Sequence, residues 1–158
     1  MPAKDDGDSP SADEHPRRRY HLPEAEEVRR VARRVLRSGR PHYPSQASYR
    51  EAVQEALRRD DPLAVLGGAR LRRLALETPG VRLSVHYTER EGRRPLTECP
   101  VCGSPLRPVK NRTLTGESVV LGQQCTRCDY WTHRVQRVPV RYTFSRSGGP
   151  RVRAVPSG

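Results

Sequence analysis

The amino-acid sequence predicts an α+β fold in which a small N-terminal helical module precedes an antiparallel β region. Apolar residues recur with a helical period up to residue 77 and alternate with polar residues from residue 81. All four cysteines fall in the alternating part, as two pairs. The expected divisions are a disordered tail at 1–20, a helical module at 21–79, a β region at 80–144 and a basic disordered tail at 145–158.

The chain is short and polar, since only 34% of its 158 residues are hydrophobic. Neither module can bury a large core, so a metal or covalent crosslink is expected. The formal net charge of +12 favours a polyanionic partner, with nucleic acid first and an acidic protein or membrane surface second. Nearly all the cations are arginine, which suits phosphate contacts, although a GC-rich coding sequence explains the same preference.

Three helical segments are expected in the N-terminal module. The first has Pro23 in its first turn, glutamates near its start, arginines near its end and Gly39 to stop it. The second starts at a capping box formed by Ser48 and Glu51. A third starts near Asp61 and Pro62, and the glycines at 67 and 68 interrupt it, which leaves residues 69–77 as a separate short helix.

The β region begins where Val81, Leu83, Val85 and Tyr87 alternate with polar residues. Further strands are expected at residues 118–122 and 137–144, with a turn at Thr115 and Gly116 before the first of these. Pro139 cannot donate a ladder hydrogen bond, so it predicts a sheet edge or a bulge.

The cysteines form two Cys-x-x-Cys pairs, Cys99 with Cys102 and Cys125 with Cys128. Two such turns can place four sulfurs on one ion, and spacing and residue type favour a structural Zn²⁺. Gly103 supplies the positive φ needed after the first pair, and Asp129 stands at the equivalent place after the second. An iron–sulfur centre is the alternative that four thiolates leave open. Four thiolates also leave no free coordination position, which argues against a catalytic metal.

The Cys-Pro-x-Cys-Gly turn, the intervening hairpin and the second Cys-x-x-Cys resemble a zinc ribbon over residues 97–144. This small β module is common in transcription, translation and replication proteins. The resemblance implies that Cys99, Cys102, Cys125 and Cys128 hold the ion. Asp129, where a second glycine would be expected, is a departure from the pattern.

The order of elements in the helical half also follows that of a winged helix. On that interpretation residues 69–77 are the recognition helix, with Arg70, Arg72 and Arg73 facing DNA and the leucines facing inward. Packing of this helix against the ribbon explains the same leucines.

The last strand and the second metal turn suggest a stacking platform beside a phosphate track. The residues concerned are Trp131, Arg134, Arg137 and Arg141. The alternative is that Trp131 only contributes to the small core of the ribbon.

These features predict a non-catalytic zinc-ribbon protein that binds DNA or RNA. The main alternative is an adaptor that docks its ribbon on a larger polymerase, ribosomal or modification complex; a zinc-stabilised subunit of a separate enzyme is a third interpretation. The sequence contains no catalytic triad and no nucleotide-binding loop, so neither enzymatic activity nor a small-molecule substrate is expected. No secretory signal or membrane-spanning stretch is present, so we expect no membrane association and a cytoplasmic location.

Overall fold

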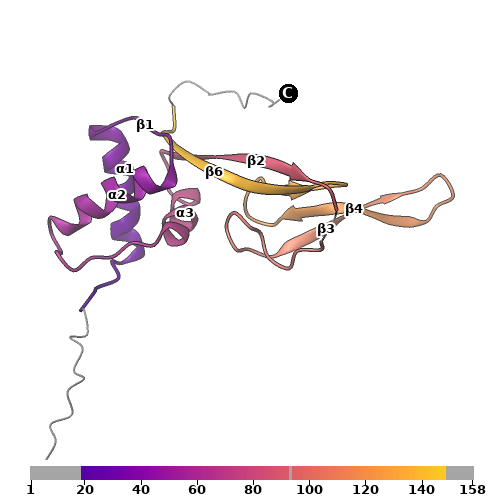
Figure 1. Cartoon of the computed structure of the whole chain (residues 1–158), viewed down its shortest axis with the longest axis horizontal. Helices are drawn as coiled ribbons and strands as arrows, with labels where there is room; N and C mark the ends of the chain where they lie inside the picture. Colours follow the sequence, from indigo (N-terminus) through magenta and orange to yellow (C-terminus); the bar gives the residue numbers. More distant parts are fainter. Residues whose placement is uncertain (1–18, 93, 149–158) are drawn as a thin grey trace, which may run out of the picture.

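The computed structural model describes residues 19–92 and 94–148, with helices at one end and strands at the other (Figure 1). The predicted tails lie largely outside these residues. The elements in chain order are α1 (Ala25–Ser38), β1 (His42–Tyr43), α2 (Gln46–Arg58), α3 (Gly68–Leu76), β2 (Val81–Arg90), β3 (Leu106–Arg112), β4 (Ser118–Cys125), β5 (Trp131–Thr132) and β6 (Gln136–Arg146).

Helices α1 and α2 form where the apolar period predicts them, but α2 starts earlier than its predicted cap. Ser45, in an extended conformation, is the N-cap, and its hydroxyl accepts a hydrogen bond from the amide of Ser48 at 3.2 Å. Ser48 lies in the first turn and donates its own hydroxyl to the Ser45 carbonyl. The predicted capping box of Ser48 and Glu51 is therefore wrong, because a serine three residues earlier satisfies the free amide.

The stretch before α3 is not helical, contrary to the prediction of a helical start near Asp61 and Pro62. The amide of Val65 donates to the carbonyl of His21 at 2.9 Å, and the amide of His21 donates to Leu63. This pairing with the chain ahead of α1 occupies the backbone groups that a helix would need. Only the predicted short helix remains, as α3, which begins after Gly67.

Two three-stranded antiparallel sheets follow, with strand orders β1-β6-β2 and β3-β4-β5. Helices and the first sheet share one core, in which the rings of Tyr49 and Phe144 lie 4.6 Å apart. Strands β3 to β5 are therefore inserted between two strands, β2 and β6, that both pack on the helices. The predicted division of the chain at residues 79 and 80 stays a prediction.

A bulge opposite β2 residues His86 and Tyr87 changes the side-chain phase of β6, as Pro139 led us to expect. Arg141 pairs with His86, whereas Arg137 lies on the same face as Tyr87, with its guanidinium carbon 4.2 Å from the Tyr87 ring centre. The bulge thus places Arg137 and Arg141 on opposite faces of the sheet.

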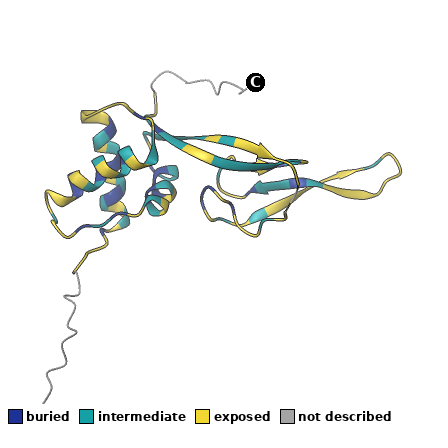
Figure 2. Ribbon diagram, in the orientation of Figure 1, coloured by how far each residue is buried: buried dark blue, intermediate teal, exposed yellow. Residues whose placement is uncertain are grey.

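The hairpin of β3 and β4 projects away from the rest of the molecule, and its outer half is exposed on both strands (Figures 1 and 2). Its turn lies where Thr115 and Gly116 predict it, and Gly116 has a φ of +88°. Within residues 19–92 and 94–148, none of the helices has the length and apolar character needed to cross a bilayer.

Candidate metal centre

Two tight turns bring the four cysteines together. Cys99 and Cys102 lie in the loop before β3, while Cys125 ends β4 and Cys128 follows it. Each turn is closed in the same way, since the amide of Cys99 donates to Ser104 and the amide of Cys125 donates to Tyr130, both at 2.8 Å. In each turn this bond joins residues five positions apart. It therefore brings the two cysteines, which are the first and fourth residues of the turn, toward one point.

The sulfur positions fit a shared ion. Cys99 Sγ lies 3.6 Å from Cys128 Sγ, Cys102 Sγ lies 3.5 Å from Cys125 Sγ, and all four sulfurs lie within 4.8 Å of one another. A tetrahedron with metal–sulfur bonds of about 2.3 Å has sulfur–sulfur edges of about 3.8 Å. Disulfides need about 2.05 Å, and the four cysteines are free thiols. The cysteines are therefore arranged to bind a metal ion, as predicted.

The two turns differ in the residue that follows the second cysteine. Gly103 has a φ of +74°, as expected, and its amide donates to the carbonyl of Cys99 at 2.8 Å. Among the described residues no residue other than glycine has a positive φ, so the expectation for Asp129 is wrong. The second turn makes the same closing bond, from Cys125 to Tyr130, without a left-handed residue at Asp129.

Burial and backbone donors act in opposite directions on the thiols. Burial raises the pKa of Cys99 to about 11 and also raises the pKa of Cys128. Burial acts on Cys125 too, but the amides of Cys128 and Arg127 donate to its sulfur and lower its pKa to about 7. Such amide donors stabilise a thiolate, the form that binds metal.

Helix α3 contacts both metal turns. Arg72 donates from Nε to the carbonyl of Val101 at 3.1 Å, and its guanidinium carbon lies 4.4 Å from the centre of the Tyr142 ring. Just after α3, Glu77 forms ion pairs with Arg127 of the second turn and with Arg29 of α1. The helical module and the cysteine cluster are thus joined from the middle of α3, through Arg72, and from the residue just after its end, Glu77.

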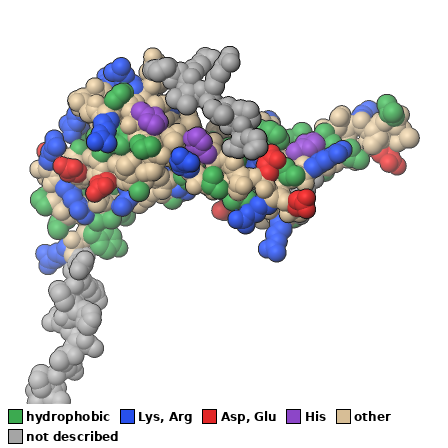
Figure 3. Space-filling model, turned by 45° about the horizontal axis from the view of Figure 1, so that its top comes forward, with side chains coloured by type: hydrophobic (Ala, Val, Ile, Leu, Met, Phe, Trp, Pro, Cys, Tyr) green, Lys and Arg blue, Asp and Glu red, His purple; other side chains and the backbone are tan. Residues whose placement is uncertain are grey.

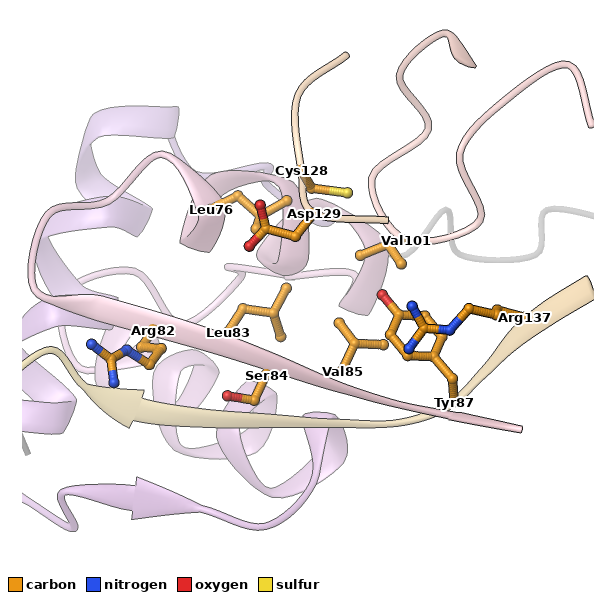
Figure 4. Close-up of a pocket in the computed structure, with 10 residues that line it drawn as sticks. All are labelled: Leu76, Arg82, Leu83, Ser84, Val85, Tyr87, Val101, Cys128, Asp129 and Arg137. Atoms are coloured by element: carbon orange, nitrogen blue, oxygen red, sulfur yellow. The ribbon is translucent and has the colours of Figure 1, made fainter. Parts of the chain in front are cut away.

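The cysteines lie in a small core of their own. Val101 and Tyr130 are buried with Cys99, Cys102 and Cys125, and side chains of β2 pack beneath them. Figure 4 shows Leu83 and Val85 pointing from β2 toward the turns. A cavity of about 460 Å³ remains between β2 and the second turn, and Cys128, the one cysteine that is not fully buried, lines it.

Two of the three arginines predicted on α3 contact other parts of the molecule. Arg70 donates to the carbonyl of Pro23 at 2.5 Å, and Arg72 bonds Gln46 as well as Val101. Arg73 is exposed and lines a groove beside Cys99 and Cys102. Whether these three residues contact nucleic acid stays a prediction. The sequence gives no direct signal for the contact between Arg72 and Val101, because the two residues lie 29 positions apart in the chain.

The structure does not bring together all four residues that were predicted to contact nucleic acid near the last strand. Trp131 is 48% exposed and lies 4.6 Å from the guanidinium carbon of Arg137, so these two are together. Arg134 is exposed in the turn between β5 and β6, and Arg141 lies on the opposite sheet face from Arg137. Their predicted contacts with nucleic acid also stay predictions.

In the part of the chain that the structure describes, fold and site together define a mixed α/β protein with three helices, two small antiparallel sheets and a four-cysteine candidate metal centre. Comparisons with protein-family models, with curated proteins and with solved structures found no match.

Proposed function

We propose that this chain is a non-catalytic nucleic-acid-binding protein in which a structural Zn²⁺ holds a zinc ribbon against a winged-helix-like module. Four thiolates at tetrahedral spacing support zinc. They also fill the coordination shell, which leaves no position for a reacting water. Free thiols in this number suit a reducing compartment such as the cytoplasm.

The order of elements supports the winged-helix part of the proposal. In the first sheet, β1 lies between the first two helices in the chain, and β2 and β6 follow the third helix, with β6 in the centre of the sheet. This is the order helix, strand, helix, helix, strand, strand of a winged helix. Here the ribbon is inserted between the last two strands and packs on α3, so α3 is partly covered and we place the main interface elsewhere.

The observation that carries the proposal is the cationic outer face of the first sheet, the face turned away from the helical core. Among the described residues, strand pairing places three arginines, two histidines and no carboxylate on it: its members are His42, Arg82, Ser84, His86, Thr88, Arg90, Gln136, Val138, Arg141, Thr143 and Ser145. Arg90, Arg141 and His86 are exposed. A sheet face that carries cations and no carboxylate suits a phosphate backbone. Lys and Arg side chains are spread along the visible surface of the molecule (Figure 3).

Binding to labelled single-stranded DNA, duplex DNA and structured RNA at about 50 and 200 mM salt tests this proposal. Each phosphate contact contributes about 0.9 to the slope of log affinity against log salt concentration. We expect the double variant Arg82→Gln with Arg141→Gln to bind more weakly and to reduce this slope by about 2. If the double variant had the same slope as the wild type, the outer face would not be part of the interface. If the wild type did not bind at about 50 mM salt, the proposed function would be wrong.

A matched control removes the same charge elsewhere. Arg34 is exposed on α1 and Arg59 is exposed directly after α2, and neither belongs to the outer face of the sheet. The double variant Arg34→Gln with Arg59→Gln lowers the net charge equally. If it reduces binding as much as the sheet variant does, the effect comes from net charge and not from the outer face.

One observation favours the adaptor as a second candidate. The projecting hairpin exposes four large apolar side chains, Val109, Leu114, Val119 and Val120. Exposed apolar residues grouped on one element are typical of protein interfaces. Purification of the tagged chain at low salt separates the two candidates: a contaminant that absorbs at 260 nm and leaves at high salt supports nucleic-acid binding, and a stoichiometric protein supports the adaptor.

A further inference from the structure

Three side chains form a stack at the edge of the metal module. The guanidinium carbon of Arg137 lies 4.2 Å from the ring centre of Tyr87 and 4.6 Å from that of Trp131. Arg137 thus lies between two aromatic rings, and Figure 4 shows it beside Tyr87. Such contacts between a cation and a ring restrict both groups.

The backbone beneath this stack is also fixed. Tyr130, which is fully buried beside the cysteines, donates its hydroxyl to the carbonyl of Arg137 at 2.8 Å. The small core around the cysteines therefore fixes the backbone of Arg137 through Tyr130. The guanidinium of Arg137 in turn packs on one face of the Trp131 ring. Trp131 nevertheless keeps 48% of its surface exposed, so a large ring is held in place and is still open to solvent.

Polar groups lie next to the exposed ring. In the second sheet Arg107 pairs with Gln124, and Gln124 pairs with Trp131, so these three residues form a row on one sheet face. Arg107 donates to the side-chain oxygen of Gln124 at 3.2 Å, which orients the Gln124 amide so that its NH₂ group is available to a ligand. Arg107 and Arg134 are both exposed.

We propose that Trp131 is a stacking site for one unpaired nucleobase, with Gln124 as a hydrogen-bond donor to the base edge and Arg107 and Arg134 as contacts for the flanking phosphates. Single-stranded DNA or RNA is then the preferred ligand, because a paired base cannot offer its face to the ring. This inference rests on the proposed nucleic-acid binding and adds the strand type and the site.

The chain contains a single tryptophan, so its emission reports on this site alone. We would titrate the zinc-loaded full chain with ten-residue oligothymidine and oligouridine, and with a ten-base-pair duplex, at low salt. Stacking should quench the Trp131 emission in a saturable way with the two single strands and much less with the duplex. Binding of the single strands without quenching would overturn the inference.

Variants then separate stacking from structure. By anisotropy of labelled oligothymidine, Trp131→Ala should lose about tenfold or more in affinity, and Trp131→Phe should lose less because it keeps a ring. Tyr20→Ala removes another exposed aromatic residue, far away on the helical module, and should bind as the wild type does. Zinc content and circular dichroism check folding, and Gln124→Ala tests the site without removing any ring.

The outcomes distinguish this inference from the proposed function. If no oligonucleotide binds the wild-type chain at low salt, the proposed function fails and the inference fails with it. If oligothymidine binds but Trp131→Ala and Gln124→Ala bind as tightly as the wild type, only the stacking site is wrong. A duplex preferred over both single strands would also overturn it.

Discussion

The guanidinium of Arg72 donates a hydrogen bond to the carbonyl of Val101 and so joins helix α3 to the first metal turn across 3.1 Å. Val101 is buried between Cys99 and Cys102, and the guanidinium carbon of Arg72 lies 4.4 Å from the centre of the Tyr142 ring. One side chain therefore connects the helical core, the central strand and the metal centre.

Replacing Arg72 should weaken this connection. Arg72→Met keeps the length of the side chain but leaves the Val101 carbonyl and Gln46 without their charged donor, which should lower the free energy of unfolding by about 1 to 3 kcal/mol. Urea unfolding of the metal-loaded protein measures this. Arg59→Met is the control, since Arg59 is exposed and should change stability by about 0.5 kcal/mol or less. Equal stability of Arg72→Met and the wild type would show that the contact does not hold the modules together.

Removing the metal should unfold one part of the molecule and leave the other. The helical core contains Phe144, which is fully buried there, so the helices should keep β6 in place near its end. The cysteine core is small and depends on the ion, because metal binding in such modules supplies folding free energy. Hydrogen exchange after chelation should therefore show loss of amide protection in residues 99–132 and retained protection in α1 to α3. If residues 99–132 kept the same amide protection after chelation as before it, this prediction would be wrong.

The helices, the alternating strands and the cysteine ligand set could be predicted from the sequence, because each depends on a local period or spacing. The insertion of the ribbon between β2 and β6 could not, because it follows from Phe144 packing on a helix almost 100 residues earlier, at Tyr49. The positions of Arg137 and Arg141 depend on a bulge whose register no local pattern specifies. Likewise, the α3 arginines were predicted to face DNA, and their contacts with Val101 and Pro23 arise only from tertiary packing.

Metal affinity should fall as the pH falls, because protons compete with the ion for thiolates. In the metal-free protein the raised pKa of Cys99, about 11, and the raised pKa of Cys128 keep both thiols protonated at neutral pH, so binding must release their protons. Below about pH 7 Cys125 also takes up a proton, since its pKa is about 7, and the dependence should become steeper. Competition with a coloured chelator between about pH 6 and 8 measures this, and a flat profile would argue against thiolate ligands.

During partial chelation, Cys128 should be the first cysteine to react with an alkylating reagent. Its three partners are buried, whereas Cys128 lines the cavity of about 460 Å³ beneath the second turn and is reachable by a small reagent. Access has to outweigh thiolate character for this result, because burial raises the pKa of Cys128 whereas the low pKa of Cys125 makes Cys125 the better nucleophile. Brief treatment with an alkylating reagent during partial chelation, followed by peptide mass spectrometry, identifies the modified cysteine. Earlier labelling of Cys125 would show that thiolate character outweighs access.

The most direct test of the central claim is X-ray absorption spectroscopy of the purified chain, together with its metal content. We expect one zinc ion per chain with four sulfur neighbours at about 2.3 Å, and three sulfur neighbours or loss of the ion in Cys102→Ser. Less than one ion per chain after purification under reducing conditions with added zinc, or disulfide bonds among these cysteines in the native protein, would contradict it.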